Sequence, residues 1–347
     1  MKVAIFAVSK KGQELADKIQ KCDTLARSRC VTFFDGEGLK DNVRREFYES
    51  DALIFVCASG IAVRLIAPFI EHKSVDPAVL VFDEGMNYCI PILSGHLGGA
   101  NELARSISAD IGTAPVITTA SDLAGLTAPD LFAKSLGLVI TDLAKAKDLT
   151  AALLNGEKIG VLNKAGDVIK LGEEDLPKGY TFLTEDNIEN FEDIKNILSI
   201  SYRDDSEDKD TVGSVNTLTL VPRCLKIGLG CRRGTQEETI RAAVDECLKL
   251  HGLYKEAVKG VFTIDLKQDE EGLLDYCNNE GIPVTFYSAD RLREVPGDFR
   301  GSDFVKEVTG VDNVCERSAL ASGGWLIVNR EVHEGVTVAV AAGPLKE

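Results

Sequence analysis

Hydrophobic and polar positions alternate in regular blocks along the first 140 residues. Short apolar runs of strand length are followed by stretches in which apolar residues recur every three or four positions, as on one face of a helix. This pattern predicts strands at 3–8, 31–34, 53–57 and 115–118 and helices at 13–21, 41–48, 61–70, 100–111 and 129–136. The alternation favours an α/β fold with a mainly parallel, Rossmann-like sheet and helices on both faces.

Two further apolar runs, at 79–82 and 88–93, have no helical stretch between them. They flank Asp83-Glu84-Gly85-Met86-Asn87, which is polar and contains a glycine. Such a segment between two strands is typical of a turn. The segment therefore predicts a β-hairpin loop.

The remainder of the chain divides into an acidic middle part and a second alternating part. Residues 173–210 hold 13 Asp and Glu against 4 Lys and Arg, and 202–210 reads as a solvated loop. From 226 onward, strands are expected at 226–229, 261–264 and 283–287, and helices at 235–250, 272–278, 303–308 and 315–321, before a hairpin of 325–328 with 337–341. Thr235 and Glu238 fit a capping box for the first of these helices. We expect an N-terminal α/β domain at 1–140, a small middle domain and linker at 141–222, and a C-terminal α/β domain at 223–347.

Composition and charge narrow the class of protein. The 347 residues are 44% hydrophobic and 27% charged, which excludes collagen-like, coiled-coil and wholly disordered chains. No apolar run is long enough to span a bilayer, and the first apolar run is too short for a signal peptide, so a cytoplasmic location without membrane contact is expected. The net charge of −16 argues against nucleic acid as a partner, and it is compatible only with local basic sites that bind an anionic small molecule.

The nine cysteines give no sign of a metal site. No pair has C-x-x-C spacing, and no histidine is judged near enough to complete a zinc motif. Most are expected to be buried thiols that act as small hydrophobic side chains. Cys231 differs because it lies in a glycine-rich turn, but as a nucleophile it would need a base, and the sequence shows none.

Four polar segments follow predicted strands of the first domain, where ligands bind in open α/β sheets. They are 9–12, the pair Ser59-Gly60, 94–102 and 118–122, and we expect them to surround one crevice. In the third segment, Gly95, Gly98 and Gly99 permit tight turns, and His96 can exchange a proton near neutral pH. The alternative is an ordinary strand-to-helix turn with a histidine packed over it.

Other polar residues near these segments admit two interpretations. Arg64, one helical turn after Ser59-Gly60, could bind a carboxylate or could be a solvated helix residue. A surface turn is the favoured interpretation for Asp76-Pro77. Asp83-Glu84 could supply general acid and base carboxylates, but an acidic hairpin tip is the favoured interpretation.

The last domain contains Gly228-Leu229-Gly230-Cys231-Arg232-Arg233-Gly234-Thr235 between a predicted strand and helix. It has one residue too many for a dinucleotide fingerprint, so nucleotide binding is disfavoured. Two adjacent arginines at a helix N-terminus suit an anion with several carboxylates or a phosphate. Arginines that face solvent are the equal alternative.

These motifs together resemble the cobalt-precorrin-5A hydrolase family of anaerobic cobalamin (vitamin B12) biosynthesis. The resemblance is strongest in Ser94-Gly95-His96-Leu97-Gly98-Gly99-Ala100-Asn101-Glu102-Leu103-Ala104 and extends to segments 76–79, 115–122, 227–235 and 302–311. It covers nearly the whole chain, although the middle domain carries no matching motif. It implies a hydrolase that opens the ring A δ-lactone of cobalt-precorrin-5A with water and releases acetaldehyde to give cobalt-precorrin-5B. It also implies that no cofactor is needed, because the corrinoid substrate carries the cobalt.

With this substrate, His96 is our candidate general base, and Glu102 either orients it or replaces it. Backbone amides of Gly98 and Gly99 would face the oxyanion, and Arg64, Arg232 and Arg233 would hold peripheral carboxylates. The other expected substrate contacts are Ser59, Gly60, Ser94, Gly95, Asn101, Thr118, Thr119, Ser121, Asp122, Gly230 and Cys231. We expect the macrocycle between the two terminal domains, since ligand sites favour domain interfaces.

Several possibilities remain open from the sequence. A non-catalytic carrier of corrinoid intermediates would share the pocket without needing a base. A nucleotide-binding regulatory protein and a sister enzyme for the cobalt-free intermediate are further alternatives. Neighbouring pathway enzymes are possible partners, and the oligomeric state is undetermined.

Overall fold

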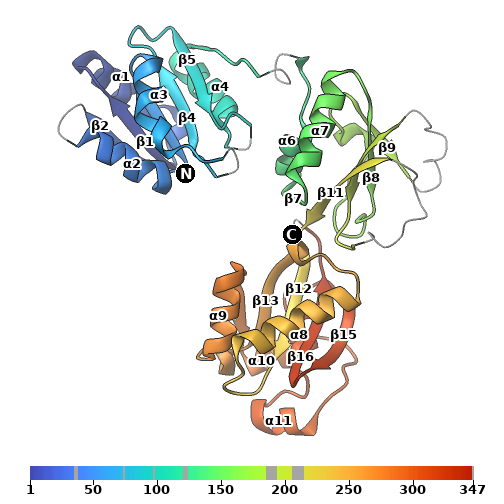
Figure 1. Ribbon diagram of the computed structural model, residues 1–347. Helices are drawn as coiled ribbons and strands as arrows, with labels where there is room; N and C mark the ends of the chain where they lie inside the picture. The colour runs from blue at the N-terminus through green and yellow to red at the C-terminus, as the bar shows by residue number, and fades with distance from the viewer. Residues whose placement is uncertain are drawn as a thin grey trace. The chain divides into compact units, whose positions relative to one another are not determined.

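The computed structural model describes residues 1–34, 38–72, 75–96, 98–119, 124–184, 194–204 and 215–345. The chain divides into two compact units, Met1–Phe132 and Ala133–Glu347. The first contains one sheet and the second contains two, and Figure 1 labels strands of each sheet. The α/β class predicted from the sequence is confirmed. Among the described residues, no helix has the length and apolar character needed to cross a membrane.

The first unit is built on a six-stranded sheet with the order β2-β1-β3-β4-β5-β6. The first four strands run parallel, β5 is antiparallel to β4, and β6 is parallel to β5. The predicted hairpin at 83–87 is therefore confirmed. The strands are β1 Lys2–Ala7, β2 Arg29–Phe34, β3 Ala52–Val56, β4 Ala78–Phe82, β5 Tyr88–Leu93 and β6 Ala114–Pro115.

Helices cover both faces of this sheet because successive residues of its buried strands point to opposite sides. Ile5 packs on the face covered by α1 and α4, whereas Phe6 packs on the face covered by α2 and α3. The helices are α1 Lys10–Gln20, α2 Leu39–Glu49, α3 Ser59–Ile66 and α4 Ala100–Ile111. The predicted strand at 115–118 is wrong in its bounds: it is reduced to β6, which ends at Pro115, a residue without the N–H that a strand ladder uses.

The second unit begins with a five-stranded sheet of order β7-β11-β10-β8-β9, which is parallel apart from β7. Because β7 pairs with β11, residues 138–140 belong to this sheet, although the expected division had assigned them to the first domain. The elements are α6 Pro129–Leu136, β7 Leu138–Ile140, α7 Leu143–Leu154, β8 Ile159–Asn163, β9 Tyr180–Leu183, β10 Asn196–Ile200 and β11 Asn216–Pro222. Residues 205–210 of the expected acidic loop lie outside the described residues.

The last sheet has the order β14-β13-β12-β16-β15 and ends in the predicted hairpin of β15 and β16. Its strands are β12 Leu225–Gly230, β13 Val258–Ile264, β14 Val284–Tyr287, β15 Trp325–His333 and β16 Val336–Ala342. The helices are α8 Glu237–Leu250, α9 Glu271–Glu280, α10 Ala289–Arg293, α11 Asp303–Thr309 and α12 Cys315–Leu320.

The start of α8 corrects the expected capping box. The residue that caps the helix is Gln236, and its side chain makes no capping hydrogen bond. Thr235 instead donates its hydroxyl to the carbonyl of Arg232, at 2.7 Å, within the preceding turn. The threonine therefore shapes the corner before the helix rather than satisfying the first amides of the helix.

Candidate functional site

The chain turns sharply where β5 leads into α4. Ser94 adopts a positive φ of 54°, and Gly99, which precedes the helix, has a φ of 82°. The Gly99 amide donates to the His96 carbonyl at 3.0 Å, and the Ala100 amide donates to the Ser94 carbonyl at 3.1 Å. The loop is thus folded back on itself by backbone hydrogen bonds, and it presents His96 from a defined turn.

Two glycines of this loop are needed for its packing. A Cβ atom on Gly98 would lie 2.4 Å from the Ser94 Cβ and 2.8 Å from the Ser94 carbonyl oxygen. A Cβ atom on Gly95 would lie 2.8 Å from the Asn101 Oδ1. These separations are too short for real atoms, so only glycine allows the loop to close this tightly.

Buried polar side chains gather beneath the loop. Asp76, Ser94 and Asn101 are all less than a tenth exposed. The Ser94 hydroxyl donates to the Asp76 carbonyl at 2.9 Å, and the Asn101 Nδ2 donates to the Thr119 hydroxyl at 3.0 Å. The start of β4, the end of β5, the start of α4 and the segment after β6 therefore meet at one edge of the sheet. We call Asp76, Ser94, Gly95, His96, Asn101 and Thr119 the Ser94 edge.

Asp76 is the residue at this edge that sequence reasoning missed. One carboxylate oxygen, Oδ1, accepts a hydrogen bond from the Glu71 amide at 3.1 Å. The other, Oδ2, is buried and has no hydrogen-bond partner among the residues that the structure describes. A buried carboxylate oxygen without a partner is rare because it loses its hydration without compensation, and it marks a candidate functional group. The available signal in the sequence was an acidic residue two positions before the wholly apolar strand Ala78–Phe82.

The predicted catalytic details are only partly supported by this geometry. His96 is half-buried, whereas Glu102 is exposed on α4, and the described contacts include no hydrogen bond between the two. The Gly99 amide is already used by the His96 carbonyl, so its predicted role as an oxyanion donor is wrong for this conformation. Thr118 is exposed next to Thr119, while Ser121 and Asp122 lie outside the described residues.

Ser59, Gly60 and Arg64 do not join the Ser94 edge. They follow β3, which is parallel to β1 and β4, whereas β5 runs in the opposite direction. The carboxyl ends of β3 and β5 therefore lie at opposite edges of the sheet. At the far edge, Ser9 after β1 donates its hydroxyl to Glu84 of the hairpin at 2.5 Å. The expectation of one crevice bounded by all four segments is wrong, because the hairpin at 83–87 reverses the chain.

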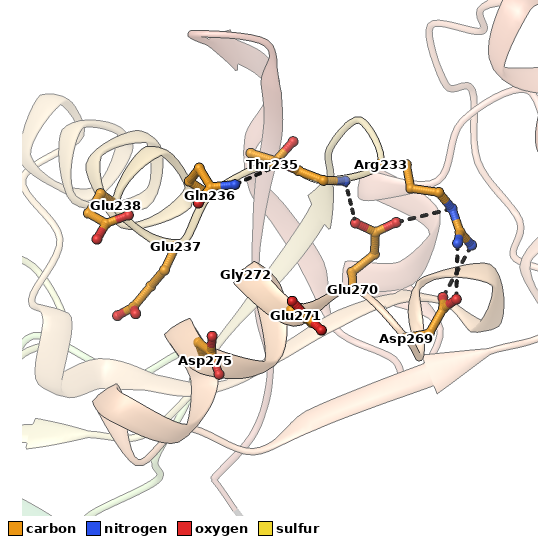
Figure 2. Close-up of a pocket in the computed structure, with 11 residues that line it drawn as sticks. Arg233, Thr235, Gln236, Glu237, Glu238, Asp269, Glu270, Glu271, Gly272 and Asp275 are labelled. Atoms are coloured by element: carbon orange, nitrogen blue, oxygen red, sulfur yellow. Dashed lines mark hydrogen bonds and ion pairs between the residues drawn. The ribbon is translucent and has the colours of Figure 1, made fainter.

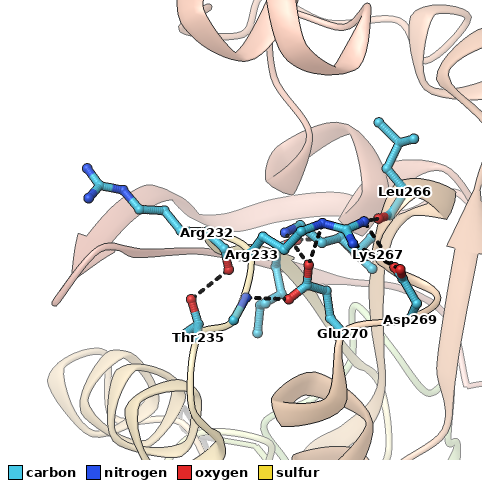
Figure 3. A network of polar contacts seen from close by, with 10 residues as sticks. Arg232, Arg233, Thr235, Leu266, Lys267, Asp269 and Glu270 are labelled. Atoms are coloured by element: carbon cyan, nitrogen blue, oxygen red, sulfur yellow. Dashed lines mark hydrogen bonds and ion pairs between the residues drawn. The ribbon is translucent and has the colours of Figure 1, made fainter.

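The second predicted anion site lies between β12 and α8, and Figure 3 shows that its two arginines behave differently. The Arg233 guanidinium contacts both Asp269 carboxylate oxygens at 3.0 and 3.2 Å, and its Nε lies 3.4 Å from Glu270. Hydrogen bonds from Arg233 hold the pKa of Asp269 below its ordinary value. The side chain of Arg232 extends away from this network. The charge of Arg233 is therefore neutralised by carboxylates of the protein, contrary to its predicted role in binding the carboxylates of a substrate.

Neighbouring residues of the same corner have structural roles. A Cβ atom on Gly228 would lie 1.8 Å from the Cys315 carbonyl oxygen, and one on Gly230 would lie 2.5 Å from the Thr337 Oγ1. These glycines therefore allow α12 and β16 to pack closely against β12, and they do not serve the close approach of a pyrophosphate. Burial raises the pKa of the Cys231 thiol, which keeps it protonated and weakens it as a nucleophile.

A pocket of about 360 Å³ opens beside Arg233, as Figure 2 shows. Its lining includes one arginine and six carboxylates, namely Glu237, Glu238, Asp269, Glu270, Glu271 and Asp275. Such a concentration of negative charge repels an anionic ligand. The pocket is thus unsuited to the peripheral carboxylates of a macrocycle.

The fold and the Ser94 edge define an α/β protein with a candidate ligand site, lined by polar side chains, where strands end. The chain matches the family descriptions Cobalamin synthesis G N-terminal over residues 41–122, Cobalamin biosynthesis central region over 127–222 and Cobalamin synthesis G C-terminus over 225–341. It is 33% identical to a cobalt-precorrin-5A hydrolase of Salmonella typhimurium over 97% of this chain and 96% of that protein. A protein of the same name from Priestia megaterium is 31% identical over 98% and 95% of the two chains.

A solved cobalamin biosynthesis protein G homologue from Sulfolobus solfataricus is 22% identical and covers 98% of this chain and 96% of its own, with a TM-score of 0.42. The full-length sequence matches show that this chain belongs to the cobalt-precorrin-5A hydrolase family, also described as cobalamin synthesis G. It is accordingly a hydrolase with a role in cobalamin biosynthesis. The family resemblance seen in the sequence is confirmed.

Proposed function

We propose that this protein opens the ring A δ-lactone of cobalt-precorrin-5A and releases acetaldehyde, which leaves cobalt-precorrin-5B. The observation that carries the proposal is the 33% identity, over 97% of the chain, to a relative with this named activity. One water molecule is consumed, and its oxygen enters the new carboxylate. The two-carbon fragment leaves when a C–C bond breaks and its electrons pass into the macrocycle.

This reaction makes three demands on the protein. Water must lose a proton as it attacks the lactone carbonyl, the tetrahedral oxyanion must be stabilised, and the freed alcohol must lose its proton as the C–C bond breaks. The demands call for one or two proton acceptors and at least one hydrogen-bond donor. The metal in the substrate belongs to the macrocycle, and no cofactor bound by the protein is part of the proposal.

The Ser94 edge offers residues that match these demands. We assign proton transfer to His96 and to the Asp76 carboxylate. The Ser94 hydroxyl, in the loop carrying His96, donates to the Asp76 backbone carbonyl and so holds the two segments together. The buried and unpartnered Asp76 Oδ2 supports this role because a proton or a water molecule would satisfy it. Glu102 is the alternative base, and the Gly98 amide remains a candidate oxyanion donor.

Substrate contacts are proposed for the polar residues around that loop. They comprise Ser94, Gly95, Asn101, Thr118 and Thr119. In the C-terminal part of the chain, Arg232, whose side chain extends away from its neighbouring polar network, is proposed separately as a residue that binds an anion. The contribution of Arg233 is expected to be small because Asp269 and Glu270 already neutralise it.

The test is anaerobic incubation of the purified protein with cobalt-precorrin-5A while any aldehyde is trapped as a hydrazone. We expect one equivalent of acetaldehyde per equivalent of substrate and a product heavier by water and lighter by acetaldehyde. Tight binding of the intermediate with no aldehyde would instead identify a carrier and overturn the proposed reaction. Parallel assays with the cobalt-free intermediate would show whether the metal is required.

A further inference from the structure

A cluster of nitrogen, sulfur and oxygen donors lies in the C-terminal part of the chain, apart from the residues discussed so far. Cys247 and His251 are four residues apart at the end of α8, so they share one face of the helix. Glu331 and His333 are two residues apart in β15, so they share one face of the strand. The packing of α8 against β15 brings the two pairs together.

Distances within the cluster are those of potential metal ligands. One donor atom each from Cys247, Glu331 and His333 lies within 4.8 Å of the other two. His251 Nε2 lies 2.9 Å from one Glu331 oxygen, and His333 Nε2 lies 3.3 Å from the other. Tetrahedral zinc, with bonds of 2.0–2.3 Å, holds its donors about 3.3–3.8 Å apart, so side-chain rotations that bring these donors to that separation would complete the site.

The surroundings of His333 point to a cation. Its Nδ1 lies 3.1 Å from the Glu246 carboxylate, while its Nε2 faces Glu331. A neutral imidazole has only one N–H and cannot donate to both carboxylates. Either the ring carries two protons, or a cation lies between Nε2 and Glu331. A carboxylate that accepts from Nδ1 while Nε2 binds a metal is a common arrangement in metalloproteins.

We propose that Cys247, Glu331 and His333 bind a divalent transition metal ion such as Zn²⁺ or Co²⁺, with His251 as the fourth donor. Imidazole, thiolate and carboxylate are the ligands that zinc takes in proteins. The thiol proton passes to solvent when Sγ becomes a ligand. The ion would fasten the end of α8 to β15, an edge strand of the last sheet. This inference is independent of the reaction proposed above.

The sequence by itself predicts no metal site, because no histidine and cysteine have the spacing of a known zinc motif. The Cys247-x-x-x-His251 spacing at a helix end and the Glu331-x-His333 spacing on a strand were the available signals. They lie about eighty residues apart, and only the packing of α8 on β15 joins them.

The experiment loads the full chain, first stripped with a chelator, with Co²⁺ and separately with Zn²⁺. We expect one Co²⁺ per chain, with the intense visible bands of a tetrahedral ion and a near-ultraviolet thiolate-to-cobalt charge-transfer band. Zn²⁺ should displace Co²⁺, abolish the bands and raise the thermal midpoint of unfolding.

Substitutions of single residues distinguish a metal site from a chance grouping of donor side chains. Cys247→Ala should remove the charge-transfer band, and His333→Gln should weaken Co²⁺ binding by at least about 100-fold, whereas Glu246→Gln should weaken it about tenfold. Cys277→Ala, which removes another buried thiol, in the neighbouring helix α9, should leave binding and spectrum unchanged. If the stripped wild-type chain binds less than one tenth of an equivalent of either metal at micromolar concentrations, or if Cys247→Ala keeps the charge-transfer band, the proposal is wrong and His333 is a doubly protonated ion-pair partner.

Discussion

Two strand-to-helix corners of this protein are similar in sequence, one between β5 and α4 and the other between β12 and α8. They differ in whether their buried polar groups have hydrogen-bond partners. Both contain several glycines followed by a helix, and both were expected to bind an anion. At the second corner, Glu270 accepts from the Gly234 amide at 2.9 Å and pairs with Arg233, so polar groups of the protein satisfy one another. At the first corner, Asp76 keeps one buried oxygen without a partner.

This difference separates a structural turn from a candidate active site. Glycine-rich turns are required wherever a chain reverses tightly, and their presence says little about ligands. An uncompensated buried group is costly to maintain and is therefore informative. Because it contains a buried oxygen without a partner, the Ser94 edge is the better candidate active site, although the other corner carries more positive charge in its sequence.

The largest expected effect comes from removing the imidazole at the Ser94 edge. His96→Gln should lower the rate of acetaldehyde release by about 10²–10⁴-fold, because a positioned base contributes that much to catalysis. Arg233→Ala should change the rate less than about tenfold, since this guanidinium is already paired. Ser9→Ala, at the opposite edge of the sheet, serves as the control. If His96→Gln and Arg233→Ala lowered the rate of acetaldehyde release equally, the assignment of the active site to the Ser94 edge would be contradicted.

Substitution of the unpartnered carboxylate should separate activity from stability. Asp76→Asn keeps an acceptor for the Glu71 amide but removes the charge, so we expect the rate to fall about 10²-fold. The free energy of unfolding should not decrease by more than about 1 kcal/mol, because one oxygen of the buried carboxylate has no hydrogen-bond partner and a neutral amide costs less to bury. Urea unfolding and single-turnover kinetics measure the two quantities. A folded, stable variant with full activity would exclude Asp76 from the reaction.

The opposite result is expected for the buried carboxylate of the second corner. Glu270→Ala should lower the free energy of unfolding by about 1–3 kcal/mol, because the Gly234 amide loses its acceptor and Lys267 loses its ion-pair partner. The rate per folded molecule should stay near that of the wild type. Denaturant titration and a rate corrected for the folded fraction provide the check, and a specific loss of rate would move the site towards this corner.

Gly98→Ala tests the packing of the loop at the Ser94 edge. The added methyl group would meet the Ser94 side chain and carbonyl, and overpacking of this kind costs about 1–3 kcal/mol. Gly166→Ala is the matched control because a Cβ atom there meets open space. We expect only the first variant to lower the midpoint of thermal unfolding.

The smallest expected effect concerns the hairpin that sends β5 in the opposite direction. Partial burial raises the pKa of Asp83, but hydrogen bonds from the Tyr88 and Asn87 amides outweigh it and hold the pKa below its ordinary value. The carboxylate therefore stabilises the fold above about pH 4, and this contribution is lost as the pH falls through the lower folded pKa. It should stay under about 1 kcal/mol because the group is still partly exposed to solvent. Unfolding of Asp83→Asn should show less dependence on pH between 3 and 6 than unfolding of the wild type.

Sequence reasoning was most successful for local structure. The alternation of strands and helices, the hairpin at 83–87 and the final hairpin all follow from the spacing of apolar residues, and the structure confirms them. The Ser94–Asn101 corner was also recognised, because glycines around a histidine are visible in a short stretch of chain. Periodicity succeeds here because backbone geometry repeats every two or 3.6 residues.

The choice of partners was decided only by the tertiary structure. The direction of β5 placed Ser59 and Ser94 at opposite edges of one sheet, and the same reversal brought Asp76 beneath the loop of His96. The charge of Arg233 is neutralised by Asp269, which lies 36 residues away in the chain. His333 lies near Cys247 because β15 packs against α8. Local spacing fixes which way a side chain faces on its own element. What that side chain meets depends on strand order and helix packing, which join residues far apart in the chain.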